Sequence, residues 1–398
     1  MHLHEYTQYD AVGLRDLIKA GEVTAAEVEA VARRALAVAN AQVNGLALPV
    51  FSPALDHASD GPFTGAPFLI KDHGPVAKDV PFFLGSRSLP GIVPPHDSDL
   101  MARFRAAGLV TLGLTTVPEL TISFSTESVE HGPTRNPWDL ERGVGGSSGG
   151  AAALVAAGAV PLAHGSDGAG SIRIPAACCG LVGLKPSRGR VPCGPDQGEA
   201  MLGMACEFAL TRTVRDAAHL LDAVQGPGVG DKYTAPPPRG RYADEPGADP
   251  GRLRVALTTE AWSGAVVDGE VAAAAVEAGR ALERMGHLVT EYDLLVTPTL
   301  GRLPAPHGTL RYDDPAHTLT SWLESIFDYG PFTMVFNISG QPAISLPLGT
   351  GDGGLPIGVQ IVASYGREDL LFRIAAQLER ALPWKDRTPR FSVSGQAT

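Results

Sequence analysis

Two clusters of glycine and serine, GGSSGG at residues 145–150 and GSDGAGS at 165–171, contain residue types that could do chemistry. The residues between them, 151–163, are mostly apolar and carry no charge, which is not typical of a flexible linker. A phosphate-binding loop would need a Lys-Ser/Thr pair or a GxGxxG turn, and neither is present. Asp167 would also repel a phosphate. The clusters therefore favour nucleophilic catalysis by a serine.

The residue types alone leave open which serine would be the nucleophile. Residues 146–150, GSSGG, match the GxSxG pattern of a nucleophile elbow with Ser148 at its centre. That elbow needs a strand directly before the serine, whereas residues 136–145, NPWDLERGVG, are polar and contain proline. Any serine nucleophile also needs a base within hydrogen-bond reach, which the two clusters do not contain.

Residues 145–192 resemble the signature of the amidase signature family of serine hydrolases, and further segments resemble the same family in the same order along nearly the whole chain. These segments are GAPFLIKD at 65–72, GPTRNPWD at 132–139, ALTRTVRDAAHLLDAV at 209–224, VTPT at 296–299, GQPAISLPLG at 340–349 and GLPIGVQIV at 354–362. The resemblance implies an α/β fold, the amidase signature fold, in which a large mixed sheet is covered on both faces by helices.

Carried over residue by residue, the resemblance implies a Ser-cisSer-Lys triad. Ser171 would be the nucleophile, Ser147 the bridging serine after a cis peptide bond, and Lys71 the base. A lysine accepts a proton only when it is neutral, and the preceding residues 68–70, FLI, offer the apolar surroundings that would lower its pKa. Ser147 would pass the proton of Ser171 to Lys71 and later return it to the leaving amine.

The second cluster is also expected to form the oxyanion hole. Its small side chains would let the backbone approach a substrate, and successive N–H groups could face the oxygen of a tetrahedral intermediate. The predicted donors are the backbone N–H groups of Gly168, Ala169, Gly170 and Ser171. Ala169 stands where the family commonly has glycine, which is a mild steric change.

Substrate contacts are predicted at Thr121, Ser147 and His73. His73 follows the base by two residues, where family members often have an apolar or amide residue, so a structural role is the alternative. The 11 histidines show no metal-ligand spacing, and no metal site or cofactor is expected.

Other polar residues in the motifs are expected to hold the structure. Ser166 and Asp167 would tie the second cluster into a hydrogen-bond network, and Arg173 resembles a structural arginine of the family. Asp139 and Asp216 are expected to hold loops.

The elements that must position these residues can be read from capping signals and periodicity. Asp10 and the capping box at Thr24 begin two helices of an N-terminal helical segment over residues 1–60. Buried strands at 66–72 and 109–116 then begin a signature core over 61–224 that contains the triad. The apolar run at 151–163 is expected to be a tightly packed helix between the clusters. Residues 252–398 would complete the sheet of one domain spanning residues 1–398.

The chain departs from the family near residue 291. Residues 285–291, MGHLVTE, run directly into 292–300, YDLLVTPTL, whereas most family members have a further, largely helical segment here. In the family this segment helps to enclose the acyl side of the substrate, so we expect an unusually open acyl pocket or a shortened chain. Leu114 and Thr116 also replace residues of a local polar network.

Composition limits the partners. The net charge of −11 argues against nucleic acid and anionic membranes, because no basic surplus is available to neutralise phosphates. The N-terminal residues are charged where a secretory signal is apolar, and the four cysteines form no CxxC pair. Free thiols and a cytoplasmic location are expected, with a small-molecule amide as partner; a homodimer stays open.

The predicted activity is hydrolysis of a carboxamide C–N bond, other than a peptide bond, through an acyl-enzyme on Ser171. Segments 206–238, 336–349 and 366–372 resemble the 6-aminohexanoate-cyclic-dimer hydrolase branch of the family, which implies cyclic or linear amides of ω-amino acids. Two alternatives stay open: a shortened, non-catalytic family member, or a glutamine-hydrolysing amidotransferase A-type subunit.

Overall fold

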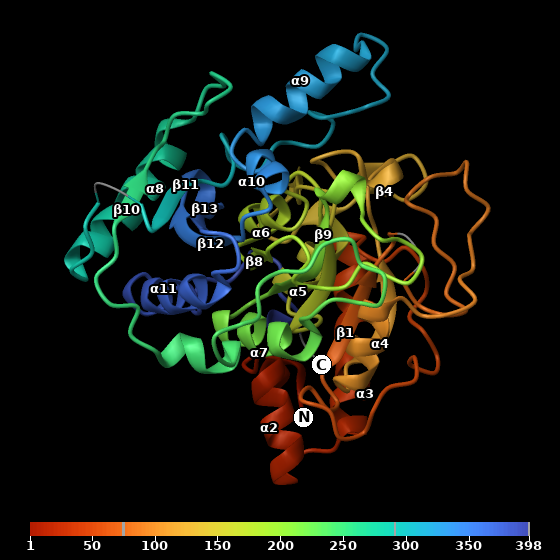
Figure 1. The fold of residues 1–398 in the computed structure, drawn as a ribbon. Coiled ribbons are helices and arrows are strands. Elements are labelled where there is room, and N and C mark those ends of the chain that lie inside the picture. Colours follow the sequence, from red (N-terminus) through yellow and green to blue (C-terminus); the bar gives the residue numbers. More distant parts are fainter. Residues whose placement is uncertain (74–75, 290–291, 397–398) are drawn as a thin grey trace.

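The computed structural model of the chain describes residues 1–73, 76–289 and 292–396, and Figure 1 labels its elements in chain order. The α-helices are α1 (Leu3–Tyr6), α2 (Ala11–Ala20), α3 (Ala25–Val43), α4 (Asp99–Ala106), α5 (Gly149–Ala156), α6 (Arg173–Cys179), α7 (Val214–Val224), α8 (Gly269–Arg284), α9 (Leu319–Tyr329), α10 (Met334–Ser339) and α11 (Glu368–Ala381). The strands are β1 (Pro67–Lys71), β2 (Val110–Thr115), β3 (Glu127–Ser128), β4 (Gly132–Pro133), β5 (Arg135–Asn136), β6 (Asp139–Gly143), β7 (Leu162–Asp167), β8 (Val182–Lys185), β9 (Cys206–Thr211), β10 (Val255–Leu257), β11 (Leu294–Pro298), β12 (Ala343–Thr350) and β13 (Pro356–Ala363). Short 3₁₀ helices are η1 (Glu119–Thr121), η2 (Met201–Gly203), η3 (Tyr242–Gly247), η4 (Asp352–Gly354) and η5 (Val393–Gly395).

A large mixed sheet forms the centre of the molecule. Within the described residues it has seven strands in the order β10-β11-β13-β12-β8-β9-β7. Strands β10 and β11 are parallel, and every other pair of neighbours is antiparallel. The predicted α/β fold class is confirmed. The strands before residue 252 form one end of this sheet and those after it form the other.

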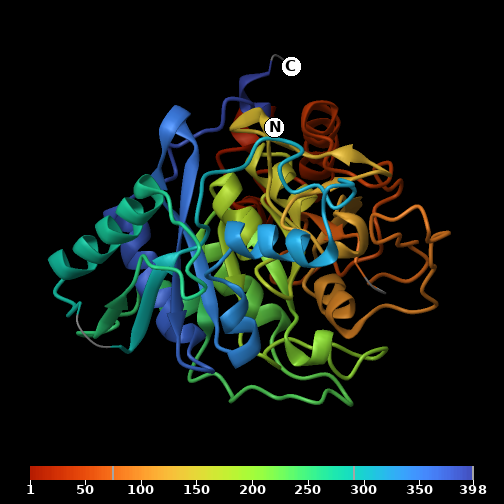
Figure 2. The ribbon, with the colours of Figure 1, turned by 90° about the horizontal axis from the view of Figure 1, so that it is seen from above.

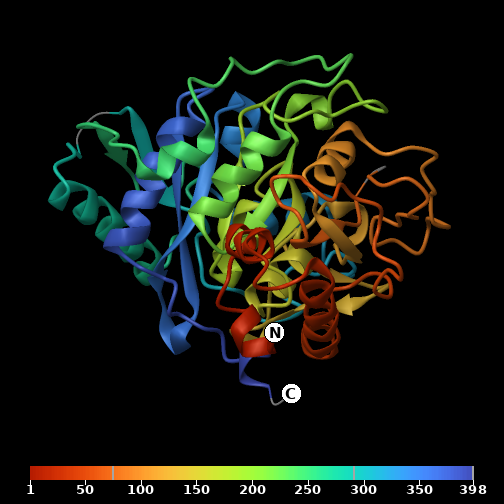
Figure 3. The ribbon, with the colours of Figure 1, turned by 90° about the horizontal axis from the view of Figure 1, so that it is seen from below.

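Helices pack against both faces of the sheet, as Figures 2 and 3 show. Helix α6 lies on one face and α8 and α11 lie on the other. The close approach of α6 depends on glycine, since a Cβ added at Gly183 would lie 2.5 Å from the Cβ of Ala176, and one added at Gly358 would lie 2.3 Å from the Cβ of Ala177. The glycines of β8 and β13 and the alanines of α6 therefore let α6 lie close to the sheet. This brings Ile172 and the second cluster, which directly precede α6, close to the sheet as well.

The apolar run between the two clusters differs from its prediction as one helix. Helix α5 ends at Ala156, and strand β7 begins at Leu162. Gly158 lies between them in the left-handed region with φ 83°, which stops the helix because few residues other than glycine adopt this conformation. The run is buried almost throughout, as its small, apolar residues predict.

Strands β1 and β2 form a separate parallel pair rather than joining the large sheet, and β1 packs beside β7.

The N-terminal helices have the predicted caps, with Asp10 accepting from the N–H of Gly13 and Thr24 forming a capping box. Asp216, on α7, accepts hydrogen bonds from the N–H groups of Ala11 and Val12, so it fastens α2 to the core.

The predicted free thiols are confirmed: Cys178, Cys179, Cys193 and Cys206 are all unpaired. Across residues 1–73, 76–289 and 292–396, no three His, Cys, Asp or Glu side chains are grouped so as to hold a metal ion. Within the same ranges, none of the helices combines the length and apolar character that crossing a bilayer requires.

Candidate active site

The two glycine-serine clusters lie against each other. Ser147 stands just before α5, Ser171 stands just before α6, and the N–H of Ser148 donates to the carbonyl of Ser171 at 3.2 Å. The hydroxyl of Ser148 lies 3.3 Å from both the carbonyl oxygen and the backbone nitrogen of Ser166. Ser148 is completely buried and fastens the first cluster to the end of β7, so its hydroxyl is occupied.

Lys71 is at the end of β1 and is completely buried. Its Nζ lies 2.8 Å from Ser147 Oγ and 2.9 Å from Ser166 Oγ. The peptide bond between Gly146 and Ser147 is cis, as the resemblance implies. The structure thus brings Lys71 and Ser147 together, and it places Ser166, expected only to tie the loop, in direct contact with the amine.

Burial lowers the pKa of Lys71 to about 7, although the carboxylates of Glu207, Asp167 and Asp72 act in the opposite direction. An amine in water has its pKa near 10.4, so burial here gives a neutral fraction near neutral pH that an exposed lysine lacks. A neutral lysine next to a serine hydroxyl can accept its proton.

Ser171 is 7% exposed, so its hydroxyl lies close to the surface that a substrate could reach. No hydrogen bond among the described residues joins its hydroxyl to Ser147 or to another group. Hydrogen bonds of catalytic groups are often long before a substrate binds, so this geometry is compatible with a relay but does not display one.

The predicted oxyanion donors differ in whether their backbone N–H groups already have a hydrogen-bond acceptor. In the described part of the chain, the N–H groups of Gly168, Ala169 and Ser171 have no acceptor. The N–H of Gly170 instead donates to Asp167 Oδ1 at 2.8 Å. The N–H of Gly170 therefore already has an acceptor in this structure, because a buried carboxylate requires donors. The role of these four N–H groups as oxyanion donors stays a prediction.

Asp167 and Arg173 form a buried ion pair beneath the second cluster. The guanidinium reaches the carboxylate twice, through Nε at 2.9 Å and Nη2 at 2.8 Å. Burial alone would raise the pKa of Asp167, but the charge and hydrogen bonds of Arg173 hold it well below its ordinary value. Arg173 also donates to Gln360 Oε1, on β13, at 2.7 Å. Both residues are completely buried, which agrees with the structural roles expected of them.

Thr333 and Asn337 contact the second cluster and were missed in the sequence analysis. The hydroxyl of Thr333 donates to the carbonyl of Ala169 at 2.6 Å, and Asn337 Nδ2 donates to Asp167 Oδ1 at 2.9 Å. They lie more than 160 positions after the residues they contact. The resemblance at 336–349 includes Asn337 without indicating what its side chain contacts, and Thr333 lies before that segment.

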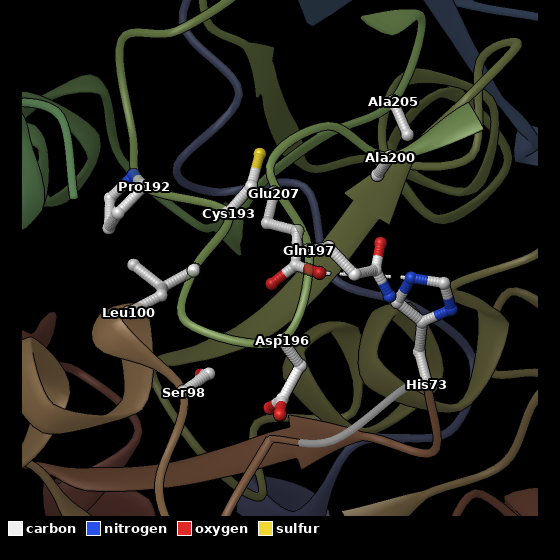
Figure 4. Close-up of a pocket in the computed structure, with 11 residues that line it drawn as sticks. His73, Ser98, Leu100, Pro192, Cys193, Asp196, Gln197, Ala200, Ala205 and Glu207 are labelled. Atoms are coloured by element: carbon white, nitrogen blue, oxygen red, sulfur yellow. Dashed lines mark ion pairs between the residues drawn. The ribbon is translucent and has the colours of Figure 1, made fainter. Parts of the chain in front are cut away.

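Of the predicted substrate contacts, neither Thr121 nor His73 is hydrogen-bonded to the triad through its side chain within the described residues. Thr121 ends η1, is partly exposed and has a left-handed φ of 59°. Figure 4 shows His73 at the edge of a pocket, with its ring facing Glu207. His73 Nε2 lies 3.7 Å from Glu207 Oε1, and its Nδ1 is buried with no partner in the described residues.

His164 and Glu207 were also missed, although both adjoin the lysine. The backbone N–H of Lys71 donates to His164 Nδ1 at 3.3 Å, and His164 Nε2 lies 3.2 Å from Glu207 Oε2. The alternating pattern of β7 and the pairing of Ser166 with Glu207 on β9 could have indicated that these side chains share one face.

Comparisons with known proteins show which family and which solved structures this chain resembles. A family model described as Amidase matches residues 27–293 and 288–372. The chain is 36% identical to 6-aminohexanoate-cyclic-dimer hydrolase of Paenarthrobacter ureafaciens, and the alignment covers 96% of each protein. A solved structure of 6-aminohexanoate cyclic dimer hydrolase matches with a TM-score of 0.90 and 34% identity, covering 97% of this chain and 99% of that one. The A-type subunit of glutamyl-tRNA(Gln) amidotransferase from Thermotoga maritima matches with a TM-score of 0.79 and 25% identity, covering all of this chain and 98% of that one.

The same comparisons bear on the predicted loss of a segment. The alignment with the Paenarthrobacter protein runs over 478 positions but contains only 96% of this chain, so about a hundred positions have no residue here. The two stretches that match the family model meet at residues 288–293. The junction predicted at residue 291 falls there, and residues 290–291 lie outside the described residues.

Proposed function

Because the chain belongs to the amidase signature family, we propose that it cleaves carboxamides through an acyl-enzyme on Ser171, with Ser147 as relay and Lys71 as base. Family membership makes it an amide hydrolase that acts on C–N bonds other than peptide bonds. The observation that carries the finer proposal is the buried Lys71 amine, 2.8 Å from the hydroxyl of Ser147.

In the first half of the reaction, neutral Lys71 accepts the proton of Ser147 while Ser147 takes the proton of Ser171. Ser171 Oγ then forms a bond to the carbonyl carbon, and the carbonyl electrons move to the oxygen. The N–H groups of Gly168, Ala169 and Ser171 would stabilise this oxyanion, where one donor is worth about 3 kcal/mol. When the C–N bond breaks, its electron pair leaves with nitrogen, which receives the proton of Lys71 through Ser147.

In the second half, water attacks the ester carbon and its proton passes through Ser147 to Lys71. The bond between the acyl carbon and Ser171 Oγ breaks, Ser171 recovers a proton, and the carboxylic acid leaves. The amide is thus split into an acid and an amine with the enzyme returned to its starting state.

For the substrate we propose a cyclic or linear amide of an ω-amino acid. The identity of 36% to 6-aminohexanoate-cyclic-dimer hydrolase, over nearly the whole of both proteins, supports this choice over a glutamine amide. The amidotransferase protein, at 25% identity, is less similar. Thr121 and His73 are proposed substrate contacts beside Ser147.

Labelling with a fluorophosphonate, followed by peptide mass mapping, tests the triad. We expect modification at Ser171, its loss in Ser171→Ala and a strong reduction in Lys71→Ala. Ser148→Ala tests the nucleophile-elbow alternative, since it removes the neighbouring hydroxyl; in folded Ser148→Ala the label should still map to Ser171. Labelling at Ser148 would contradict the triad, and an unlabelled but folded protein would favour the non-catalytic alternative.

An amide panel then tests the substrate class. Release of amine from linear and cyclic 6-aminohexanoate dimers, with no release of ammonia from glutamine, is the expected result. Glutamine hydrolysis together with inert aminohexanoate amides would instead favour the amidotransferase alternative.

A further inference from the structure

Three polar side chains on the neighbouring strands β7 and β9 lie on the face of the large sheet that Lys71 contacts. His164 and Ser166 are two residues apart on β7, so their side chains point to the same face. Glu207 is paired with Ser166 across the antiparallel β7–β9 ladder, which places its side chain on that face too. Ser166 contacts the Lys71 amine, and His164 contacts the Lys71 backbone.

The hydrogen bonds of His164 fix where its proton lies. Its Nδ1 accepts the backbone N–H of Lys71 at 3.3 Å, so the ring proton is on Nε2. That nitrogen then donates to Glu207 Oε2 at 3.2 Å. The histidine is completely buried between the two, so it holds the carboxylate at a fixed place relative to the strand that ends in Lys71.

The groups around Lys71 differ in how their charge is compensated. Asp72, next to it on the chain, accepts the backbone N–H groups of Phe83 and Gly85. Asp167, on β7, is paired twice with the Arg173 guanidinium.

Among the described residues, the side-chain hydrogen-bond and ion-pair partners of Glu207, on β9, are the histidines His164 and His73. His164 donates to it from Nε2, because its Nδ1 accepts the backbone N–H of Lys71. Burial lowers the pKa of the other neighbour, His73, to about 4, so this ring is neutral near pH 7. Of the carboxylates around Lys71, Glu207 acts most strongly on the amine, and within the described residues no cation is bonded to it.

We propose that Glu207, held by His164, is a positioning residue whose negative charge sets the pH range in which Lys71 acts as a base. It rests on the proposed role of Lys71. Burial favours the neutral amine, and a nearby carboxylate favours the ammonium. Glu207 therefore opposes burial, and it keeps a proton available on Lys71 for the leaving amine. Removing its charge should leave Lys71 neutral down to a lower pH.

Glu207→Gln tests this inference, because glutamine keeps the shape and can still accept from His164 Nε2. The readout is the rate constant for fluorophosphonate labelling of Ser171 between about pH 5 and pH 9. In the native protein the rate should rise through about pH 7 as Lys71 loses its proton. In Glu207→Gln we expect the midpoint to fall by about one pH unit.

Asp196→Asn is the matched control. Asp196 lines the same pocket (Figure 4), and its carboxylate is paired with His96, so the variant removes an equal charge from the same cavity. Its midpoint should match that of the native protein. Glu207→Asp keeps the charge and should move the midpoint much less than Glu207→Gln does, whereas a purely structural role would make the two alike.

An unshifted midpoint in folded Glu207→Gln overturns the inference, and so does an equal shift in Asp196→Asn or Glu207→Asp. Failure of the proposed function looks different, since Ser171 would then be unlabelled in every protein at every pH. The side chain of Glu207 is a quarter exposed, so the glutamine variant is expected to fold, which circular dichroism checks.

Discussion

At the scale of single residues, the site depends on backbone as much as on side chains. Gly170 precedes Ser171, the proposed nucleophile, has a left-handed φ of 134°, and packs against Thr333. Its N–H is bonded to Asp167, whereas the N–H groups of Ala169 and Ser171 have no acceptor in the described part of the chain. Glycine at this position therefore holds the shape of the loop before Ser171.

Gly170→Ala should abolish labelling of Ser171 and destabilise the protein. The new Cβ would lie 2.4 Å from Thr333 Oγ1, closer than any normal contact, in a backbone conformation that costs alanine on the order of 1–3 kcal/mol. Urea unfolding and fluorophosphonate labelling measure the two effects. Gly251→Ala is the control, because Gly251 also has a left-handed φ, of 69°, but has no atom within 4 Å of the new Cβ. Normal labelling of Gly170→Ala would show that this loop does not position Ser171.

Family resemblance predicted which residues would form the triad, and the structure was needed to find the residues that surround Lys71 and Ser147. Lys71 and Ser147 do meet, as predicted, across 76 positions of sequence. His164, Glu207 and Thr333 were not predicted, because a polar residue in isolation is consistent with many solvated or structural roles. Their contacts depend on strand pairing and on segments that approach only after folding.

At the scale of elements, the helix α2 is fastened to α7 by carboxylates. Asp216 accepts the N–H groups of Ala11 and Val12, and Asp10, the cap of α2, lies near it. Burial, together with the charge of Asp10, raises the pKa of Asp216 to about 7. The capping signals of α2 were readable from sequence, whereas its attachment to a residue 205 positions away was not.

The contribution of Asp216 to the free energy of unfolding should fall as pH rises between about 4 and 7. Asp216 binds its proton more tightly when folded, so its contribution is fully present below its ordinary pKa and is lost as pH rises through about 7. The loss is at most about 1.4 kcal/mol per pH unit for this group. In urea unfolding at several pH values, the free energy of unfolding of Asp216→Asn should therefore fall less, or rise more, with pH than that of the native protein. Glu379, whose burial raises its pKa to about 7, acts in the same direction as Asp216 in both proteins, and His73, whose burial lowers its pKa to about 4, acts in the opposite direction.

Asp222→Asn, on the same helix, serves as control for Asp216→Asn, since its carboxylate binds the N–H groups of Tyr242 and Ala243 rather than those of α2. Equal slopes with pH in the native protein and Asp216→Asn would show that Asp216 does not keep its proton in the folded state.

At the scale of the whole molecule, the fold tolerates a large loss. The solved structure of 6-aminohexanoate cyclic dimer hydrolase matches this chain with a TM-score of 0.90. In the alignment with the Paenarthrobacter protein, about a hundred positions nevertheless have no residue in this chain. The sheet remains continuous, because β10 and β11 pair on either side of the junction. Around α10, apolar side chains are exposed, with Ile338 56% and Trp262 59% accessible.

The shorter chain should accept a wider range of acyl groups than its longer relatives. The family resemblance implies that the absent segment helps to enclose the acyl side of the substrate, so without it we expect fewer contacts to restrict the size of that group. Values of kcat/KM for amides with acyl groups of increasing width should decline less steeply for this protein than for the Paenarthrobacter enzyme, assayed in parallel. Amides varied only in the leaving amine control for general differences in activity. Equal decline along the acyl series would mean that other parts of this chain close the pocket, and restored selectivity on inserting the relative's segment at residues 290–291 would identify the segment as the cause.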